Sequence, residues 1–268
     1  MMNALFDIGN TRIKWARLEQ SSRPPVPPDL HDIGVADHTE LSLEEIAAVN
    51  WSDWPPPEQV VVSSVVADEH WRQLQDWCFQ HWRQTPVRVT SAAAGYGIRN
   101  AYIQPEELGS DRWAALVGAH HLLYSETCVI DCGTAITVDF LDAAGQHLGG
   151  YIIPGLRLMQ QSLAQRTDAI PLLSGLETGS GRWRSTEPGK STAECIGHGL
   201  LMAATGLVEE SCRKMKMQTG KSFHCLLTGG NAEQLASCLG EGVRLEPNLV
   251  LLGLARIAAE NHSLGSTD

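Results

Sequence analysis

Residues 4–15 read Ala4-Leu-Phe-Asp-Ile-Gly-Asn-Thr-Arg-Ile-Lys-Trp15, and this stretch decides the fold. Its first three residues are small or apolar, as in a buried strand, and residues 12–18 then alternate polar and apolar side chains. Between them lies Asp7-Ile-Gly-Asn-Thr11, where Gly and Asn tolerate the backbone angles of a tight turn. The stretch therefore predicts a β-hairpin whose tip presents a carboxylate, backbone N–H groups and a hydroxyl.

A tip of this composition suits a polyphosphate with its metal ion. Backbone amides and a hydroxyl can bind phosphate oxygens, while the carboxylate holds Mg²⁺ directly or through water. An ordinary hairpin turn is the alternative, because turns that contain Gly-Asn are common.

The same plan recurs in Cys128-Val-Ile-Asp-Cys-Gly-Thr-Ala-Ile-Thr-Val-Asp-Phe140, where Asp131, Gly133 and Thr134 follow an apolar strand and a second strand follows them. Asp7 and Asp131 are separated by almost half of the 268-residue chain. Two such hairpins predict two similar α/β lobes of the actin-like ATPase (ribonuclease H-like) type, with a nucleotide cleft between them. We place the N-terminal lobe at residues 1–118 and the C-terminal lobe at residues 119–268.

The composition and the absence of certain motifs argue against several classes of protein. A net charge of −11 argues against binding to a nucleic-acid backbone. The seven cysteines form no Cys-x-x-Cys pair, so they predict neither a disulfide framework nor a zinc site but reduced, mostly buried thiols. No signal pattern or long apolar run is found, which predicts a cytoplasmic protein without membrane contact. The chain also lacks Gly-x-x-x-x-Gly-Lys-Ser/Thr, which excludes a P-loop kinase.

Hydrophobic periodicity predicts the other main elements. An unbroken β-branched run at residues 60–66 predicts a buried strand, and residues 87–90 and 225–228 predict shorter ones. Tryptophans at helical spacing in residues 68–83 predict core packing rather than a ligand site. Residues 21–28 and 178–189 predict loops, and 149–155 a turn-rich crossover. Further helices are predicted at residues 41–49, 112–123, 156–164, 193–217 and 249–259.

Gly109-Ser-Asp-Arg112 opens the predicted helix at residues 112–123, with Ser110 as its expected N-cap. Asp111 suits a helix start because the helix dipole favours an anion there, so a simple capping role is one interpretation. Arg112 is unfavourable beside the same dipole. A cation at this position indicates another task, such as holding an anionic ligand.

Four motifs in order make the chain resemble the type III pantothenate kinase family along almost its whole length. They are Asp7-x-Gly9-Asn10-Thr11-x-x-Lys14-Trp15, Gly109-x-Asp111-Arg112, Asp131-x-Gly133-Thr134-Ala135-x-Thr137-x-Asp139 and Gly149-Gly150-x-Ile152-x-Pro154-Gly155. The resemblance implies ATP-dependent phosphorylation of pantothenate to 4′-phosphopantothenate, the first step of coenzyme A biosynthesis. It also implies a homodimer.

The resemblance also implies residue roles. Asp111 accepts the proton of the pantothenate hydroxyl, and the substrate is bound by Tyr102, Gly109, Ser110, Asp111, Arg112 and Thr192. Asp131 holds a monovalent cation, K⁺ or NH₄⁺. The ATP phosphates and Mg²⁺ are bound by Asp7, Ile8, Gly9, Asn10, Thr11, Arg12, Ile13 and Lys14, and Thr134 also contacts ATP. Asp7, Asp131 and Asp139 are expected to lie together beside the triphosphate, where cations offset their charge.

Two other functions are open at this stage. One is a different small-molecule kinase of the same architecture. Only the Gly-x-Asp-Arg motif argues against this alternative. The other is a non-catalytic nucleotide-binding regulator, such as the transcriptional accessory factor of the same family. The presence of Asp111, Arg112 and Asp131 favours the enzyme, because a regulator needs no base.

Overall fold

The computed structural model describes the whole chain except residues 1, 20–26, 67, 166–182 and 266–268. The chain divides into two compact units, which are residues 1–124 with 248–268, and residues 125–247. The boundary predicted from the sequence lies six residues earlier and leaves the C-terminal helix in the second lobe. Most of the predicted loop at 21–28 and residues 178–182 of the second predicted loop lie outside the described residues. Residues 183–189 are described and form neither helix nor strand, as predicted.

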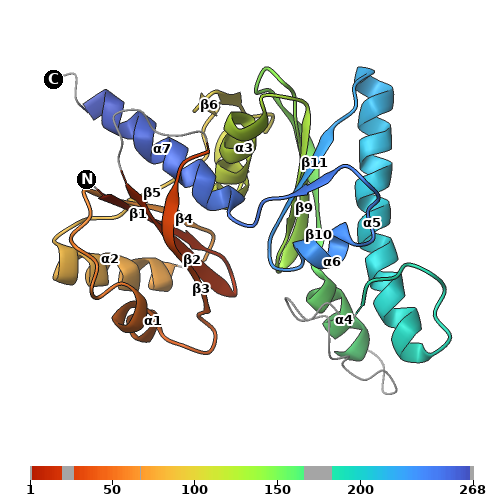
Figure 1. Cartoon of the computed structure of the whole chain (residues 1–268), viewed down its shortest axis with the longest axis horizontal. Coiled ribbons are helices and arrows are strands. Elements are labelled where there is room, and N and C mark those ends of the chain that lie inside the picture. Colours follow the sequence, from red (N-terminus) through yellow and green to blue (C-terminus); the bar gives the residue numbers. More distant parts are fainter. Residues whose placement is uncertain (1, 20–26, 67, 166–182, 266–268) are drawn as a thin grey trace. The chain divides into compact units, whose positions relative to one another are not determined.

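Unit 1 is built on a five-stranded sheet with the order β3-β2-β1-β4-β5 (Figure 1). The first three strands are antiparallel neighbours, and β1, β4 and β5 run parallel. The strands are β1 (Met2–Ile8), β2 (Arg12–Glu19), β3 (Leu30–Asp37), β4 (Gln59–Ser64) and β5 (Val87–Arg88). The first hairpin and the strand at 60–66 are thereby confirmed, whereas β3 was not predicted.

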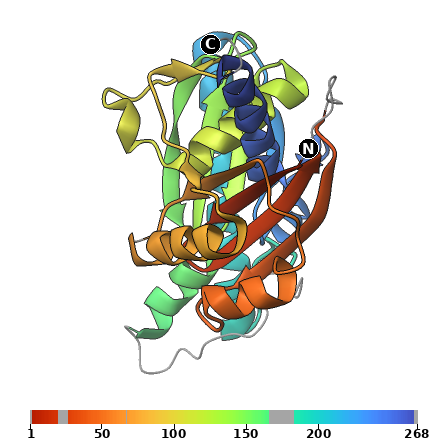
Figure 2. The same ribbon diagram turned by 90° about the vertical axis from the view of Figure 1, so that its left-hand side faces the viewer.

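Helices cover both faces of this sheet. α1 (Leu43–Asn50) and α2 (Asp68–Trp82) pack on one face, and α3 (Ser110–Leu123) and α7 (Leu249–Gly265) lie on the other, as Figure 2 shows from the side. Trp77 and Trp82 of α2 belong to the core, which confirms that the tryptophans pack rather than bind a ligand. Ser42 caps α1 in a capping box with Glu45. A small ribbon, β6 (Ala94–Gly95) and β7 (Ile98–Arg99), and the 3₁₀ turn η1 (Pro105–Glu107) precede α3.

α7 joins unit 1 because two glycines let it cross α3 closely. A Cβ on Gly118 of α3 would lie 2.6 Å from the carbonyl oxygen of Leu249, and a Cβ on Gly253 of α7 would collide with the backbone of Ala114. Backbones can approach this closely only where no side chain intervenes. The helix that ends the chain is thus a structural part of the first lobe.

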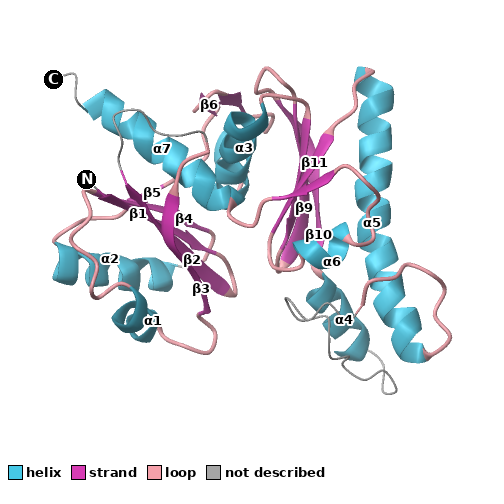
Figure 3. Cartoon of the chain, viewed as in Figure 1, coloured by secondary structure: helices cyan, strands magenta, loops and turns pink. Residues whose placement is uncertain are grey.

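Unit 2 repeats the topology of unit 1 (Figure 3). Its sheet has the order β10-β9-β8-β11-β12, with β10, β9 and β8 antiparallel and β8, β11 and β12 parallel. The strands are β8 (Thr127–Cys132), β9 (Ala135–Leu141), β10 (His147–Pro154), β11 (His224–Thr228) and β12 (Val243–Leu245). The same order and directions in both sheets confirm the prediction of two similar lobes.

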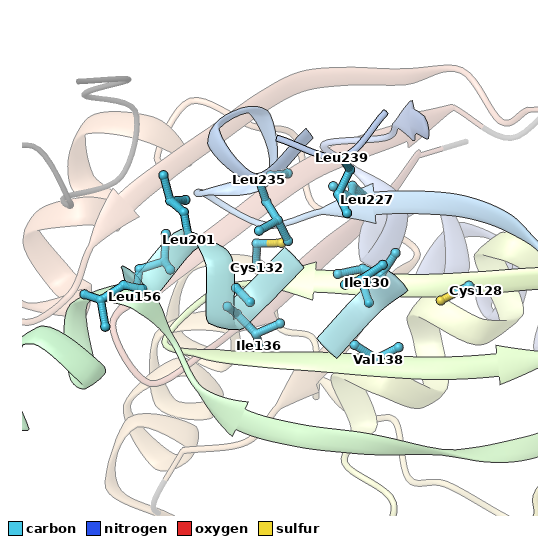
Figure 4. Packing of buried hydrophobic residues seen from close by; sticks show 14 of the residues in the cluster. Cys128, Ile130, Cys132, Ile136, Val138, Leu156, Leu201, Leu227, Leu235 and Leu239 are labelled. Carbon is cyan, nitrogen blue, oxygen red and sulfur yellow. The ribbon is translucent and has the colours of Figure 1, made fainter. Parts of the chain in front are cut away.

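One face of this sheet carries the core of unit 2. Alternate residues of β8 and β9, including Cys128, Ile130 and Val138, pack under α5 and α6, as Figure 4 shows for part of the cluster. The helices are α4 (Leu156–Gln165), α5 (Thr192–Thr219) and α6 (Ala232–Ala236). The predicted crossover at 149–155 is largely wrong: residues 147–154 form the edge strand β10, because they pair with β9 despite their two glycines.

Candidate active site

The first hairpin has a tight turn at the end of the unit 1 sheet where β1 ends and β2 begins. Ile8 pairs with Ile13 and Asp7 pairs with Lys14, so the carboxylate and the ammonium belong to facing positions of the two strands. The backbone N–H of Gly9 closes the turn by donating to the carbonyl oxygen of Arg12 at 2.9 Å. The predicted phosphate-binding residues are therefore gathered in one compact turn.

His38 anchors this turn, although no sequence pattern predicts that it does. Its Nε2 lies 2.6 Å from the carbonyl oxygen of Gly9, and its backbone N–H donates to the carbonyl oxygen of Thr11 at 3.1 Å. His38 directly follows β3, a strand with no clear alternation of polar and apolar residues. Without that strand, the sequence carried no signal that would bring residue 38 to the turn.

The N-terminus of α3 is hydrogen-bonded to the same end of the sheet. β1 and β4 are parallel, and Asp7 lies opposite Ser63 in their register. The Ser110 hydroxyl accepts a hydrogen bond from the Ser64 backbone N–H at 3.1 Å and lies 3.2 Å from the Ser63 hydroxyl. The start of α3 thus lies beside the carboxyl ends of β1 and β4, where open α/β sheets bind ligands.

Ser110 is not the helix cap that the sequence predicted. Gly109 occupies the N-cap position and makes no side-chain capping bond, while Ser110 is the first helical residue. The Ser110 side chain is buried and turns to Ser63 and Ser64. Serine is a favoured N-cap residue, but here the Ser110 hydroxyl forms its hydrogen bonds with the buried end of β4 instead.

Asp111 lies in the first turn of α3 and is partly exposed. Its Oδ1 accepts a hydrogen bond from the Arg112 backbone N–H at 2.7 Å. A Cβ on Gly109 would lie 2.5 Å from the same oxygen, so glycine leaves the space that this carboxylate occupies. The motif Gly-x-Asp therefore has a steric reason as well as a chemical one.

Arg112 and Tyr102 form the second half of this group. Arg112 is buried at 7% exposure, and its Nη1 donates to the Tyr102 hydroxyl at 2.7 Å. The guanidinium also lies over the Tyr102 ring, 5.5 Å from its centroid. A buried arginine beside a carboxylate is a preorganised cation for an anionic ligand.

The loop before α3 is held so that Tyr102 reaches Arg112. The Ser91 hydroxyl bonds to the carbonyl oxygens of Pro105 and Leu108 at 2.8 and 2.6 Å. Asn100 donates to the Pro105 carbonyl at 3.0 Å and accepts from the Tyr102 backbone N–H at 3.0 Å. Neither Ser91 nor Asn100 was predicted to matter, because their bonds are formed only by the folded loop.

Unit 1 therefore gathers most of the predicted substrate residues with the predicted ATP turn. Thr192, the remaining substrate residue, is the exposed first residue of α5 in unit 2. Thr134 and Asp131 also belong to unit 2.

The second hairpin is also closed by a backbone hydrogen bond, but its loop is one residue shorter than that of the first. The Gly133 N–H donates to the Ala135 carbonyl oxygen at 3.0 Å, and the Gly155 N–H donates to the Thr134 carbonyl oxygen at 2.9 Å. Thr134 itself is exposed at the tip. A hairpin turn closed by backbone hydrogen bonds thus positions residue 134.

Asp131 lies in a cradle of backbone. A Cβ on Gly133 would be 3.6 Å from Asp131 Oδ1, and a Cβ on Gly229 would collide with that oxygen. Gly229 has φ +90°, which L side chains rarely adopt, so this turn after β11 requires glycine twice over. A carboxylate surrounded by peptide groups offers oxygen ligands to a hard cation, so these residues fit such an ion.

Asp139 is buried, contrary to the prediction that it lies beside the triphosphate. It is 2% exposed, and its Oδ1 lies 3.0 Å from Nε2 of His147, which is 1% exposed. A carboxylate enclosed in this way within the β9–β10 pair is part of the interior of unit 2. The expectation that it faces a triphosphate is therefore wrong, and its role is to pair with a buried histidine.

The repeated sheet and the two closed hairpins define the class of the protein. It has the two-lobed α/β fold of the actin-like ATPases and sugar kinases. One solved structure of similar fold is the activator of 2-hydroxyisocaproyl-CoA dehydratase from Clostridium difficile with bound ADPNP, with a TM-score of 0.52 over 100% of this chain and 98% of that one. At 13% identity this similarity shows the fold alone.

Comparison of sequences places the chain more narrowly. The model of the type III pantothenate kinase family matches residues 4–214. The chain is 34% identical over 264 residues to a type III pantothenate kinase from Nitrosococcus oceani, covering 97% of this chain and 94% of the relative. It is 38% identical over 259 residues to another from Azoarcus sp. strain BH72, covering 96% and 91%. The chain belongs to the type III pantothenate kinase family.

Membership confirms the predicted enzyme class, a kinase that uses ATP and a divalent metal ion, over the non-catalytic regulator. None of the helices in the described part of the chain is both long and apolar enough to span a bilayer.

Proposed function

We propose that this chain transfers the γ-phosphoryl group of ATP to the primary hydroxyl of pantothenate, with Asp111 as the proton acceptor. The observation that carries the proposal is the Asp111–Arg112–Tyr102 group at the start of α3, on the sheet edge that also bears the Asp7–Lys14 turn. The reaction is the first step of coenzyme A biosynthesis.

Asp111 orients the acceptor more than it activates it. Phosphoryl transfer has a loose transition state, so little proton transfer is needed before that state is reached. A carboxylate that is held by the Arg112 N–H and the space left by Gly109 can accept a hydrogen bond from a hydroxyl in a fixed direction. The proton passes to an Asp111 oxygen as the new O–P bond forms.

Arg112 supplies the local positive charge. The chain carries a net charge of −11, which repels both ATP and the pantothenate carboxylate at long range. Tyr102 fixes the guanidinium in place without neutralising it. A fixed cation next to the reacting hydroxyl stabilises the charge of the transferring group.

The remaining ligands follow from the two hairpin tips. Asp7 would hold Mg²⁺ and the turn of residues 8–14 would bind the phosphates, and the ion when bound would neutralise charge on the triphosphate. Asp131 would hold K⁺ or NH₄⁺, and Thr134 would contact ATP. Thr192 would contact pantothenate. That the nucleotide lies between the two lobes, and that the enzyme is cytoplasmic, stay predictions.

A homodimer is proposed as the working form. Exposed apolar side chains on the edge strand β10 and on α5, namely Tyr151, Ile152 and Met202, offer surface that a second copy could cover. Gly197 of α5 packs against Trp183 within unit 2, but Gly199 has open space around it. A contact through the Gly199 side of α5 would repeat itself across a twofold axis.

The decisive experiment is an ADP-release assay with pantothenate as the sole acceptor. ADP formed in proportion to phosphopantothenate, detected by mass, would support the proposal. ADP release that does not depend on pantothenate, or that rises with a sugar instead, would contradict it.

A further inference from the structure

Three cysteines that are far apart in the sequence meet in unit 2. Cys128 on β8 and Cys225 on β11 face each other in the parallel register, and Cys212 comes from α5, which covers that face. Their sulfur atoms all lie within 4.8 Å of one another, and the Sγ atoms of Cys212 and Cys225 are 3.9 Å apart. Within the described residues, no other group of three or more His, Cys, Asp or Glu side chains is as close.

These distances suit one metal ion with three sulfur ligands. Metal–thiolate bonds are about 2.3 Å long, so three sulfurs around an ion in one plane lie about 4.0 Å apart. The Cys212–Cys225 separation already matches, and the longer separations need only small side-chain rotations. The cysteines were predicted to be mostly buried thiols without a metal site; Cys128 is buried, while Cys212 and Cys225 are partly exposed, which leaves a path for an ion.

The surroundings select a soft ion. Apolar side chains, including Phe223 and Met215, pack against the same core, and the group contains no oxygen or nitrogen ligand. His224 precedes Cys225 on β11, so its side chain points to the opposite face of the sheet. Structural zinc sites have four ligands in a tetrahedron, and this group offers three. Soft sulfur ligands also favour Cu(I).

We propose that Cys128, Cys212 and Cys225 form a three-sulfur site for one Cu(I) ion. Binding of Cu(I) as a three-thiolate complex releases the thiol protons to solvent.

The site can be tested by titrating the full-length protein with Cu(I) under nitrogen, in competition with the chromophoric chelator bicinchoninate. We expect the protein to retain one equivalent of Cu(I). Cys212→Ser and Cys225→Ser should each weaken binding by more than the roughly 10–100-fold that loss of an outer-shell partner costs. X-ray absorption should show three sulfur ligands at about 2.3 Å.

The matched control is the double variant Cys195→Ser/Cys238→Ser, which removes two thiols outside the cluster and should still retain one equivalent. Circular dichroism and pantothenate kinase activity verify folding, and Cys212→Ala replaces Cys212→Ser if the latter misfolds. Equal loss of Cu(I) in the control, or retention in the cluster variants, would overturn the site. A fourth ligand in the absorption spectrum, or equally tight binding of Zn²⁺, would overturn its assignment to Cu(I).

Discussion

The Arg112 guanidinium donates a hydrogen bond to the Tyr102 hydroxyl at 2.7 Å and lies over the ring of the same tyrosine. The two residues thus hold each other in place at the start of α3. This relationship explains how a cation is kept at a helix N-terminus, where the dipole disfavours it.

Arg112→Lys should lower kcat about 10²-fold, the scale for loss of one positioned donor, with a smaller rise in KM for pantothenate. Lysine keeps the charge but loses the planar fork and the stacking on Tyr102. Tyr102→Phe keeps the ring and should lower kcat less. Steady-state kinetics with both substrates varied measure the effect, and Arg72→Lys on the exposed face of α2 is the control. A change in KM alone would move Arg112 to the carboxylate end of pantothenate.

Asp111→Asn should retain the fold and the affinity for ATP but lose turnover by about 10²-fold or more, because the amide cannot accept the proton. The matched control is Asp68→Asn, which removes a carboxylate from the first turn of α2. Single-turnover kinetics and nucleotide titration separate the two effects. Turnover near that of the parent protein would reduce Asp111 to a residue that only favours the helix start.

Replacing K⁺ or NH₄⁺ by Na⁺ at equal ionic strength should lower activity, because the proposed Asp131 site would discriminate between ions by size. Asp131→Asn should remove the difference between the salts. Initial rates in the three chlorides measure this. The same rates in all three for the parent protein would eliminate the monovalent-cation site.

Gly118→Ala should destabilise unit 1 by about 1–3 kcal/mol, since the new methyl group meets the backbone of α7. Gly206→Ala in α5 is the control, because its Cβ would enter open space. There the better helix propensity of alanine should stabilise by up to about 1 kcal/mol. Thermal unfolding followed by calorimetry compares them. If the Gly118→Ala protein is as stable as the parent, α7 can shift away from the new methyl group at little cost in free energy.

Light scattering should give a mass near twice the 29.2 kDa of one chain. Met202→Glu would place a charge on the exposed face of α5 and should shift the protein toward the monomer. A parent protein with the mass of a single chain at every concentration would contradict the dimer. If the Met202→Glu variant is still a dimer, the interface does not include this face of α5.

Local patterns in the sequence were sufficient for the two hairpins and for most helices. The turn residues at 7–11 and 131–134 and the alternation around them specify strands without help from distant residues. The equal topology of the two sheets follows from that repetition. Likewise, Tyr102, Gly109 and Arg112 could be named before any contact was known, through their resemblance to one family.

The tertiary structure alone decided which distant groups meet. The Ser110 hydroxyl bonds to the end of β4 instead of capping its helix, and α7 returns to the first lobe at Gly118 and Gly253. Asp139 is enclosed with His147, and three separate cysteines converge. Sequence patterns report the periodicity of one element at a time. Burial of a polar group and close helix crossing depend instead on which surfaces pack together, and packing is settled only when the whole chain folds.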